Sequence, residues 1–264
     1  MPGPGTAVTV GSVRIGEFRC PPTDPMWTGL NFIGTEPHVV FPRAPVRIRQ
    51  AGNDEFVTTR NHVVLYAAGD EYRRRCVADA GDNCSFLALS PELGEQLGAP
   101  ARGLVDISAE VFLRHRQLLA KVRAGAESLD IEEQAITLAS AALASRSHPQ
   151  QVAPSPHLRA MAERTKELLA VEYAGDHRLA DLAWMLGVSP YHLARSFRAV
   201  TGWSLHGYRT SLRLRAVLDV LVDPAADLAL LARETGFANH SHLTMAFHRQ
   251  FGLTPSAARA DLAA

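Results

Sequence analysis

The stretch LADLAWMLGVSPYHLARSFRAVTG, residues 179–202, is followed by a similar stretch, LALLARETGFANHSHLTMAFHRQFG, at residues 228–252. Apolar and glycine positions of the two stretches align at an offset of 49 residues before the central turn and 50 residues after it. The second stretch therefore carries one extra residue in its turn. An internal repeat of this kind predicts one structural unit that is built twice.

Each copy has the pattern of two helices joined by a tight turn. Gly187 and Gly236 come just after the first apolar segment, where a residue in the left-handed conformation can end a helix. Ser189 and Asn239 follow, and both residue types are good N-caps for a second helix. A period near 50 with only two copies argues against a solenoid, although a helix pair can also be a plain packing unit. The repeat predicts helix–turn–helix units at about residues 179–200 and 228–250.

The second helix of each unit has one apolar face, and its opposite face has no carboxylate. Between Gly187 and Leu218 there are five arginines and no acid, and between Thr235 and Ala260 there is again no acid. An acid there would repel phosphate, whereas Arg, Thr, Ser and His can bond base edges and phosphates. The net charge of the whole chain is zero, so only this local distribution indicates double-stranded DNA as the partner. The residues expected to face DNA are Tyr191, Ala194, Arg195 and Arg198 in the first unit, and His240, Ser241, Thr244, Met245 and His248 in the second.

The segment between the units predicts a connecting helix over about residues 210–223. Reading helices that enter successive major-groove segments on one face of a duplex should lie about 34 Å apart. Trp184 and Trp203 are expected to pack inside the protein rather than stack on bases.

The front of the chain consists of short runs rich in Val, Ile and Phe, with Gly, Pro, Asn and Asp between them, which predicts a small β-sandwich or barrel. From Ile107 the apolar spacing becomes helical and predicts a helical hairpin. The apolar face of this hairpin either covers the barrel or forms a homodimer contact. The chain is thus expected to be α+β, divided into a β domain over 1–106, a hairpin over 107–147, a Pro-rich linker over 148–156 and a DNA-binding domain over 157–264.

Two segments, LADLAWMLGVSPYHLARSFRAVTGWSLHGYRTSLRLRAVLDVL and ALLARETGFANHSHLTMAFHRQFGLTPSAAR, resemble the DNA-binding domain of AraC/XylS-type transcription regulators. The resemblance implies seven helices, two helix–turn–helix units joined by a central helix, and an asymmetric site in adjacent major grooves. It implies the same DNA-facing positions, and Ala194 and Met245 depart from it because longer polar or basic side chains are common there. It also implies a cupin-like β-barrel that receives a small effector or serves as a regulatory platform, with RNA polymerase as a further partner.

No residue pattern in the front domain names an effector. In EYRRRCV, residues 71–77, Arg73 and Arg75 would share one face of a strand, so they are the candidates for holding a carboxylate or phosphate effector. The alternative is a solvated edge strand kept soluble by its charges.

The sequence predicts no metal site, no cofactor and no catalytic activity. The front histidines, His38, His62, His115 and His148, lack an H-x-H pattern with a carboxylate. The three cysteines, Cys20, Cys76 and Cys84, fit buried thiols of a reducing cytosol, and a metal- or oxidant-sensing role is the alternative.

No apolar run approaches the roughly 20 residues of a membrane span. The start, MPGPGTAVTV, lacks the features of a secretory signal. We therefore expect a cytoplasmic protein with no membrane partner. The sequence leaves open the effector, the operator, the regulated genes, the oligomeric state and whether regulation is activation or repression.

Overall fold

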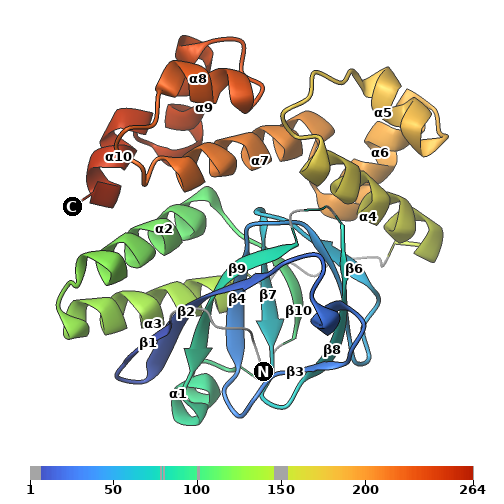
Figure 1. Cartoon of the computed structure of the whole chain (residues 1–264). Helices are drawn as coiled ribbons and strands as arrows, with labels where there is room; N and C mark the ends of the chain where they lie inside the picture. The colour runs from blue at the N-terminus through green and yellow to red at the C-terminus, as the bar shows by residue number, and fades with distance from the viewer. Residues whose placement is uncertain (1–6, 78, 80, 100–101, 146–153, 264) are drawn as a thin grey trace.

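The structure is a computed structural model that describes residues 7–77, 79, 81–99, 102–145 and 154–263. The described part begins with a β domain, continues through a helical hairpin and ends in a helical region (Figure 1). The α+β class predicted from the sequence is therefore confirmed.

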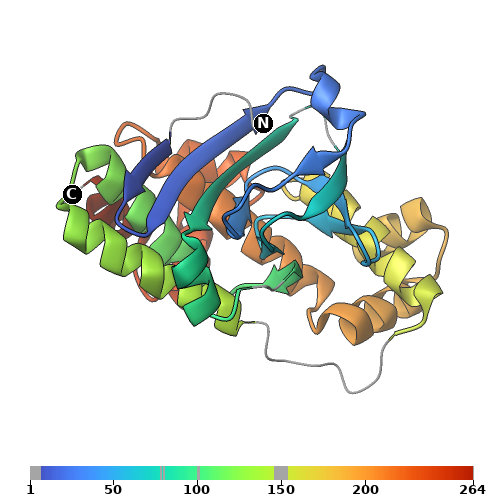
Figure 2. The ribbon, with the colours of Figure 1, turned by 90° about the horizontal axis from the view of Figure 1, so that it is seen from below.

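The β domain consists of two antiparallel sheets that face each other (Figure 2). One sheet has the strand order β1-β2-β9-β4-β7-β10, and the other has the order β3-β8-β5-β6. The strands are β1 (Ala7–Val10), β2 (Val13–Cys20), β3 (Asn31–Phe32), β4 (His38–Pro42), β5 (Val46–Gln50), β6 (Phe56–Thr58), β7 (His62–Tyr66), β8 (Glu71–Cys76), β9 (Asp82–Leu89) and β10 (Gly103–Asp106). A 3-10 turn η1 (Pro25–Trp27) and the short helix α1 (Pro91–Gln96) complete this domain.

Strand β7 shows why some runs in the sequence do not alternate between polar and apolar residues. Val64 and Tyr66 point between the two sheets, where they pack with residues of β5 and β6. Val63 and Leu65 point to the other side, where helices cover the sheet. Both faces of β7 are therefore removed from water, and every residue of the strand is buried.

The helical hairpin consists of α2 (Ala109–Ala124) and α3 (Ser128–Ala144). The Ser108 hydroxyl accepts a hydrogen bond from the Val111 amide at the start of α2, and Gly125 ends the helix in the left-handed conformation. Helix α3 packs on β1 and β2, while α2 packs on α7, α9 and α10 of the helical region. The buried apolar residues of the hairpin are Val111, Phe112, Leu118, Leu119, Ala120, Ile131, Ala135, Leu138, Ala139, Ala142 and Leu143.

The apolar face of the hairpin is thus used within the chain itself. The interpretation that it covers the barrel agrees with these contacts, and a homodimer contact through the same face would have to displace them. Homodimerisation stays a prediction. The predicted linker at 148–156 lies outside the described residues as far as residue 153.

The helical region contains seven helices between residues 154 and 263. Helices α5 with α6 and α8 with α9 form the two helix–turn–helix units, and α7 connects them (Figure 1). Among the described residues, none of the helices is both long and apolar enough to cross a membrane. The helices are α4 (Pro156–Val171), α5 (Leu179–Leu186), α6 (Pro190–Thr201), α7 (Leu205–Val220), α8 (Leu228–Glu234), α9 (His240–Phe251) and α10 (Pro255–Ala263).

The two units are anchored in different ways. The first unit has a core of its own, in which Leu193 and Phe197 of α6 pack with Tyr208 of α7. The second unit, through Leu243 and Phe247 of α9, belongs to the same continuous apolar core as the hairpin and the larger sheet. Only the second unit therefore shares its hydrophobic core with the front of the chain.

Candidate nucleic-acid interface

The turns of both units have the chemistry that the sequence predicts. Ser189 accepts a hydrogen bond from the amide of the third residue of α6 at 3.2 Å, and Asn239 does the same for α9 at 2.9 Å. Gly187 and Gly236 have φ angles of 70° and 80°, which favour glycine. These caps fix where each second helix begins and hence which of its faces is turned outward.

The second helices present the same pattern of exposure to solvent. Residues 191–200 of α6 and 241–250 of α9 have the same order of exposed, half-buried and buried positions. The buried positions are Leu193, Ser196 and Phe197 in α6 and Leu243, Ala246 and Phe247 in α9. Equivalent positions of the two repeats therefore have the same exposure to solvent.

The residues predicted to face DNA all lie on the open faces of these helices, and none of them is buried. Tyr191 is 72% exposed and Met245 is 67% exposed, whereas Ala194 and Thr244 are half-buried at the edge of the face. The remaining predicted residues, Arg195, Arg198, His240, Ser241 and His248, are exposed.

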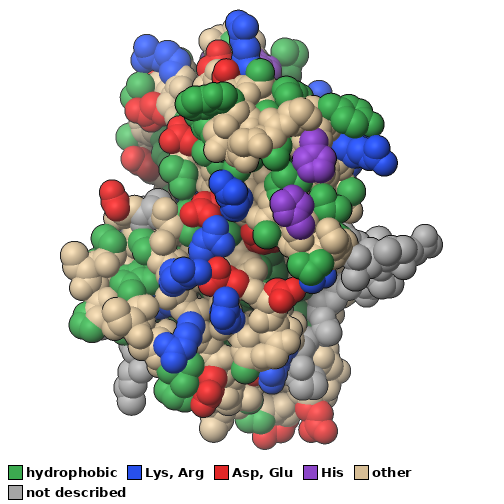
Figure 3. All heavy atoms as spheres, turned by 90° about the vertical axis from the view of Figure 1, so that its right-hand side faces the viewer, with side chains coloured by type: hydrophobic (Ala, Val, Ile, Leu, Met, Phe, Trp, Pro, Cys, Tyr) green, Lys and Arg blue, Asp and Glu red, His purple; other side chains and the backbone are tan. Residues whose placement is uncertain are grey.

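The polar groups of these faces are available to a ligand. Within the described residues, neither Arg195 nor Arg198 lies within ion-pair distance of a carboxylate. Arg195 donates only to the Tyr191 hydroxyl at 3.3 Å, and Thr244 contacts His240 at 3.4 Å. The upper half of Figure 3, where the helical region lies, shows histidine and basic side chains on the surface.

Not all arginines of the acid-free stretch belong to this surface. Arg213 and Arg215 of α7 are 9% and 1% exposed, so they cannot contact DNA in this structure. Arg213 donates to the carbonyl oxygen of Gly236 at 2.7 Å and to that of Gly175 at 2.8 Å. It thereby ties the turn of the second unit to the loop before α5. The charge count in the sequence overstated the basic surface and missed this structural role.

Trp184 differs from the expectation, because it is 82% exposed on α5 and does not pack inside the protein. Trp203 does pack, in the core of the first unit and edge-on to Tyr208. A lone tryptophan in an amphipathic segment gives no signal that separates these two outcomes.

Helix α7 joins the helical region to the β domain through buried polar contacts. The Tyr208 and Thr59 hydroxyls are 2.8 Å apart, and the Ser211 hydroxyl donates to the Asn61 side chain at 2.8 Å. Arg215 donates to two backbone carbonyl oxygens of the front of the chain, at 2.5 and 2.6 Å. These side chains hold α7 against the β domain.

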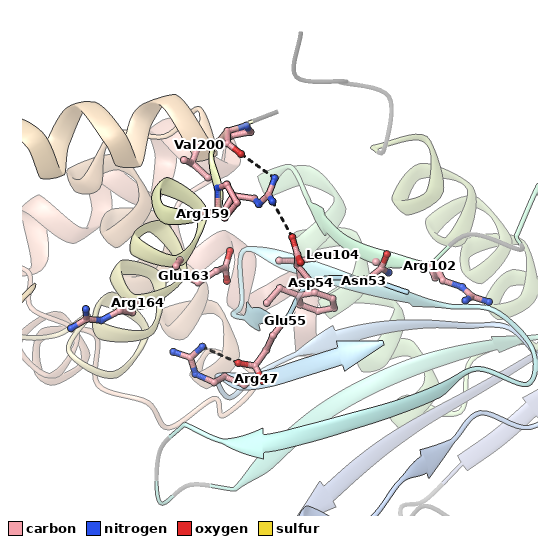
Figure 4. A pocket seen from close by; sticks show the side chains of 15 residues that line it. Arg47, Asn53, Asp54, Glu55, Arg102, Leu104, Arg159, Glu163, Arg164 and Val200 are labelled. Atoms are coloured by element: carbon pink, nitrogen blue, oxygen red, sulfur yellow. Dashed lines mark hydrogen bonds and ion pairs between the residues drawn. The ribbon is translucent and has the colours of Figure 1, made fainter. Parts of the chain in front are cut away.

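A groove of about 900 Å³ separates α4 from the smaller sheet (Figure 4). Its charged side chains are largely paired with each other. Arg159 of α4 reaches Asp54 at 3.3 Å, and Arg47 reaches Glu55 at 3.4 Å. Glu163 of α4 accepts a hydrogen bond from the backbone amide of Val57 in β6 at 2.6 Å. Helix α4, which packs on the first unit, therefore meets the β domain across a polar groove that is open to solvent.

The arginine run on β8 agrees with the solvated-edge interpretation in part. Strand β8 lies between β3 and β5, but β3 pairs only with Glu71 and Tyr72, so the three arginines have a strand neighbour only on the β5 side among the described residues. Arg73 and Arg75 do share a face, but it is the exposed outer face of the sheet. Arg74 points inward, where it lines a cavity of about 540 Å³ between the two sheets. The inward arginine, and not the outward pair, is therefore placed to meet a ligand in the interior.

Cys20 and Cys84 lie in one apolar cluster on the neighbouring strands β2 and β9. Among the described residues there is no group of three or more His, Cys, Asp or Glu side chains that could hold a metal ion. Cys20 and Cys84 are buried, Cys76 is half-buried, and none of the three forms a disulfide.

The helical region contains a segment that matches a known protein family. Residues 182–261 match a family model described as a helix-turn-helix domain. The chain is 26% identical over 104 residues to the Msm operon regulatory protein of Streptococcus mutans, which covers 39% of this chain and 37% of that protein. It is 33% identical over 105 residues to the HTH-type transcriptional regulator RipA of Corynebacterium glutamicum, which covers 39% of this chain and 31% of that protein. The matched segments span about a third of the length of these relatives.

A solved structure of ToxT from Vibrio cholerae aligns with 96% of this chain and 100% of its own, at 11% sequence identity and a TM-score of 0.39.

Proposed function

We propose, from the premise that residues 182–261 form a helix-turn-helix domain of the AraC type, that this chain is a sequence-specific DNA-binding transcription regulator. Helices α6 and α9 would enter adjacent major-groove segments of one duplex. The observation that carries the proposal is the pair of equivalent helix faces, both open to solvent and both without a carboxylate. The proposal assigns no catalytic activity to the chain.

Side chains on the two faces would have different roles. Arg195 and Arg198 would supply base-edge and phosphate contacts, because a guanidinium can bond guanine or a phosphate through two N–H groups. Thr244 and His248 would contact bases or phosphates from α9, and Ala194 and Met245 could touch a thymine methyl group. The remaining open positions, Tyr191, His240 and Ser241, would complete the two contact surfaces.

The first experiment selects bound sequences from random duplex DNA and measures affinity for the preferred site by fluorescence anisotropy. Arg195→Ala should weaken binding by about 1–3 kcal/mol and relax the preference at one position of the site. The matched control is Arg164→Ala, because Arg164 is also exposed and lies on α4, outside the two reading helices. Equal affinity and preference in the Arg195 variant and the wild type would remove Arg195 from the reading surface.

Salt dependence tests the rival class, a sensor whose partner is not DNA. The logarithm of the affinity should fall linearly with the logarithm of the salt concentration, with a slope set by the phosphates contacted. A protein that shifts no duplex at low salt and instead takes up stoichiometric zinc would support the rival.

We further propose that the β domain modulates DNA binding, because the strands that line the cavity also contact α4, and α4 packs on α6 of the first unit. In β5, Val46 and Ile48 line the cavity, while Arg47 between them points outward and pairs with Glu167 of α4. In β6, Thr58 lines the cavity, and the amide of Val57 donates a hydrogen bond to Glu163 of α4. A ligand that moves these strands would move α4 by the same contacts.

We place the protein in the cytoplasm because it acts on DNA. RNA polymerase, a small effector and a second copy of the chain are proposed partners. A reporter gene behind the selected site would show whether binding activates or represses transcription, and light scattering of the free and DNA-bound protein would give the number of copies.

A further inference from the structure

The cavity between the two sheets has walls that specify a class of ligand. Its volume of about 540 Å³ suits a molecule of one or two rings, since small-molecule sites are commonly about 300–1,000 Å³. Most of its lining is apolar. The apolar side chains come from both sheets, from η1 and from the segment after it, and include Phe18, Met26, Val40, Ile48, Val64 and Phe86.

The charges of the cavity are already neutralised within the protein. Arg74, whose side chain is 1% exposed, pairs with Asp82 at 2.6 Å. The Arg74 guanidinium also lies over the rings of Phe18 and Trp27, at 4.8 and 4.9 Å from the ring centroids. At the rim, Arg14 and Glu36 form another ion pair. An anionic ligand would have to compete with Asp82 for Arg74, and a cationic ligand would find no free carboxylate.

Two hydroxyl groups of the cavity are left without a partner. Within the described residues, no hydrogen bond involves the hydroxyl of Tyr66 or of Tyr72. Tyr66 lies on β7 of one sheet and Tyr72 on β8 of the other, and their rings pack with centroids 4.8 Å apart. Burial raises the pKa of Tyr72 to about 12 and that of Tyr66 well above its ordinary value, so both hydroxyls stay protonated and can donate.

We infer that this cavity binds a neutral, largely apolar ring compound that carries an acceptor oxygen, such as an aryl ketone, held by the Tyr66 and Tyr72 hydroxyls. The inference rests on the proposed regulatory role of the β domain and names the ligand of that domain. A sugar fits poorly, because most of its hydroxyl groups would be left against apolar walls without a hydrogen-bond partner, and each such group weakens binding.

The test uses the full chain and three matched probes in isothermal titration calorimetry. Benzophenone is a neutral ketone with two rings, diphenylmethane lacks the acceptor oxygen, and 4-benzoylbenzoate adds a carboxylate. Benzophenone should bind, and each of the other two should bind at least about 10-fold more weakly, because the hydroxyl donors lose their acceptor or the anion meets Asp82. Preference for the carboxylate, or no heat with benzophenone up to its solubility limit, would overturn the inference.

Variants locate the interaction. Tyr72→Phe removes one hydroxyl and should weaken benzophenone binding by about 3- to 10-fold while leaving diphenylmethane unchanged. The matched control is Tyr173→Phe, whose ring contacts Arg60 outside the cavity. An equal loss for both probes, or an equal loss in the control, would contradict the assigned role of the hydroxyl.

Irradiation of bound benzophenone gives an independent readout, because the excited ketone inserts into a neighbouring C–H bond without a leaving group. Mass spectrometry should find the adduct in the peptides that contain Met26 or Val40, and an adduct confined to the helical region would overturn the placement. Anisotropy with the selected DNA is measured on the same preparation. A protein that binds benzophenone but no DNA would contradict the proposed regulator function and leave the ligand inference standing. A protein that binds DNA but not benzophenone would contradict the ligand inference and leave the proposed function standing.

Discussion

Asp219→Ala is expected to destabilise the folded chain by about 3 kcal/mol. Asp219 of α7 is 9% exposed and is the carboxylate that three arginines from the front of the chain approach. Arg60 lies 2.9 Å from it, Arg116 lies 3.4 Å and Arg43 lies 3.7 Å. Its removal would leave a cluster of positive charge at the contact between α7 and the β domain.

The magnitude follows mainly from Arg116. Its side chain is fully buried, and none of its nitrogens has a hydrogen-bond partner among the described residues. Burial lowers its pKa to about 10, which still leaves it charged at neutral pH. Breaking a buried ion pair costs about 3–5 kcal/mol, and we take the lower end because Arg43 and Arg60 reach solvent.

The assay is thermal unfolding followed by circular dichroism. A loss of about 3 kcal/mol should lower Tm by about 6–12 °C in a chain of this size. Asp261→Ala is the control, since Asp261 is exposed on α10 and has no described partner, so its Tm should change little. Arg116→Met in the Asp219→Ala background should recover part of the loss. An unchanged Tm in Asp219→Ala, or no recovery in the double variant, would refute the reasoning.

Three more predictions concern the turns, the pH dependence and the DNA contact. Gly187→Ala should cost about 1 kcal/mol in urea unfolding because of its positive φ; Gly236→Ala should cost more, because its Cβ would lie 2.4 Å from a backbone oxygen, whereas nothing lies within 4 Å at Gly187. Burial lowers the pKa of His115 and His62 well below their ordinary value. The contribution of these neutral histidines to the free energy of unfolding is therefore fully present above about pH 6.5 and is lost as the pH falls. His115→Phe should reduce the slope of the free energy of unfolding against pH by up to about 1.4 kcal/mol per pH unit. Arg198→Ala should reduce the salt slope of DNA binding by about one if Arg198 contacts a phosphate, and an unchanged slope with weaker binding would place it on a base instead.

The helical region could be predicted closely because its signals are local. The caps at Ser189 and Asn239 and the glycines at Gly187 and Gly236 act within a few residues, and the repeat shows each signal twice. The order of exposed and buried positions then follows from the helical period, which also gives the open faces of α6 and α9.

The contacts between distant segments could not be predicted, because no local pattern encodes them. Arg213 and Arg215 read as part of a basic surface in the sequence, yet the fold buries them against backbone carbonyl groups. The charges of β8 indicated a solvated edge, and the exposed Arg73 and Arg75 fit that pattern, but the sequence did not show that β3 would pair with the start of the strand or that Arg74 would face inward. In Arg73, Arg74 and Arg75 the same residue type has two environments, and only the topology decides which side faces the cavity.

The unequal anchoring of the two units has a consequence for the choice of promoter. Since α9 belongs to the core that continues into the larger sheet, while the first unit has a separate core and the neighbouring helix α4 meets the smaller sheet through ion pairs, a loosened contact at α4 would let α6 move while α9 stays in place. Such a hinge would alter the tolerated distance between the two halves of an operator more than the bases read in either half. Operators that differ only by an inserted base pair would then be sorted by the state of the front domain.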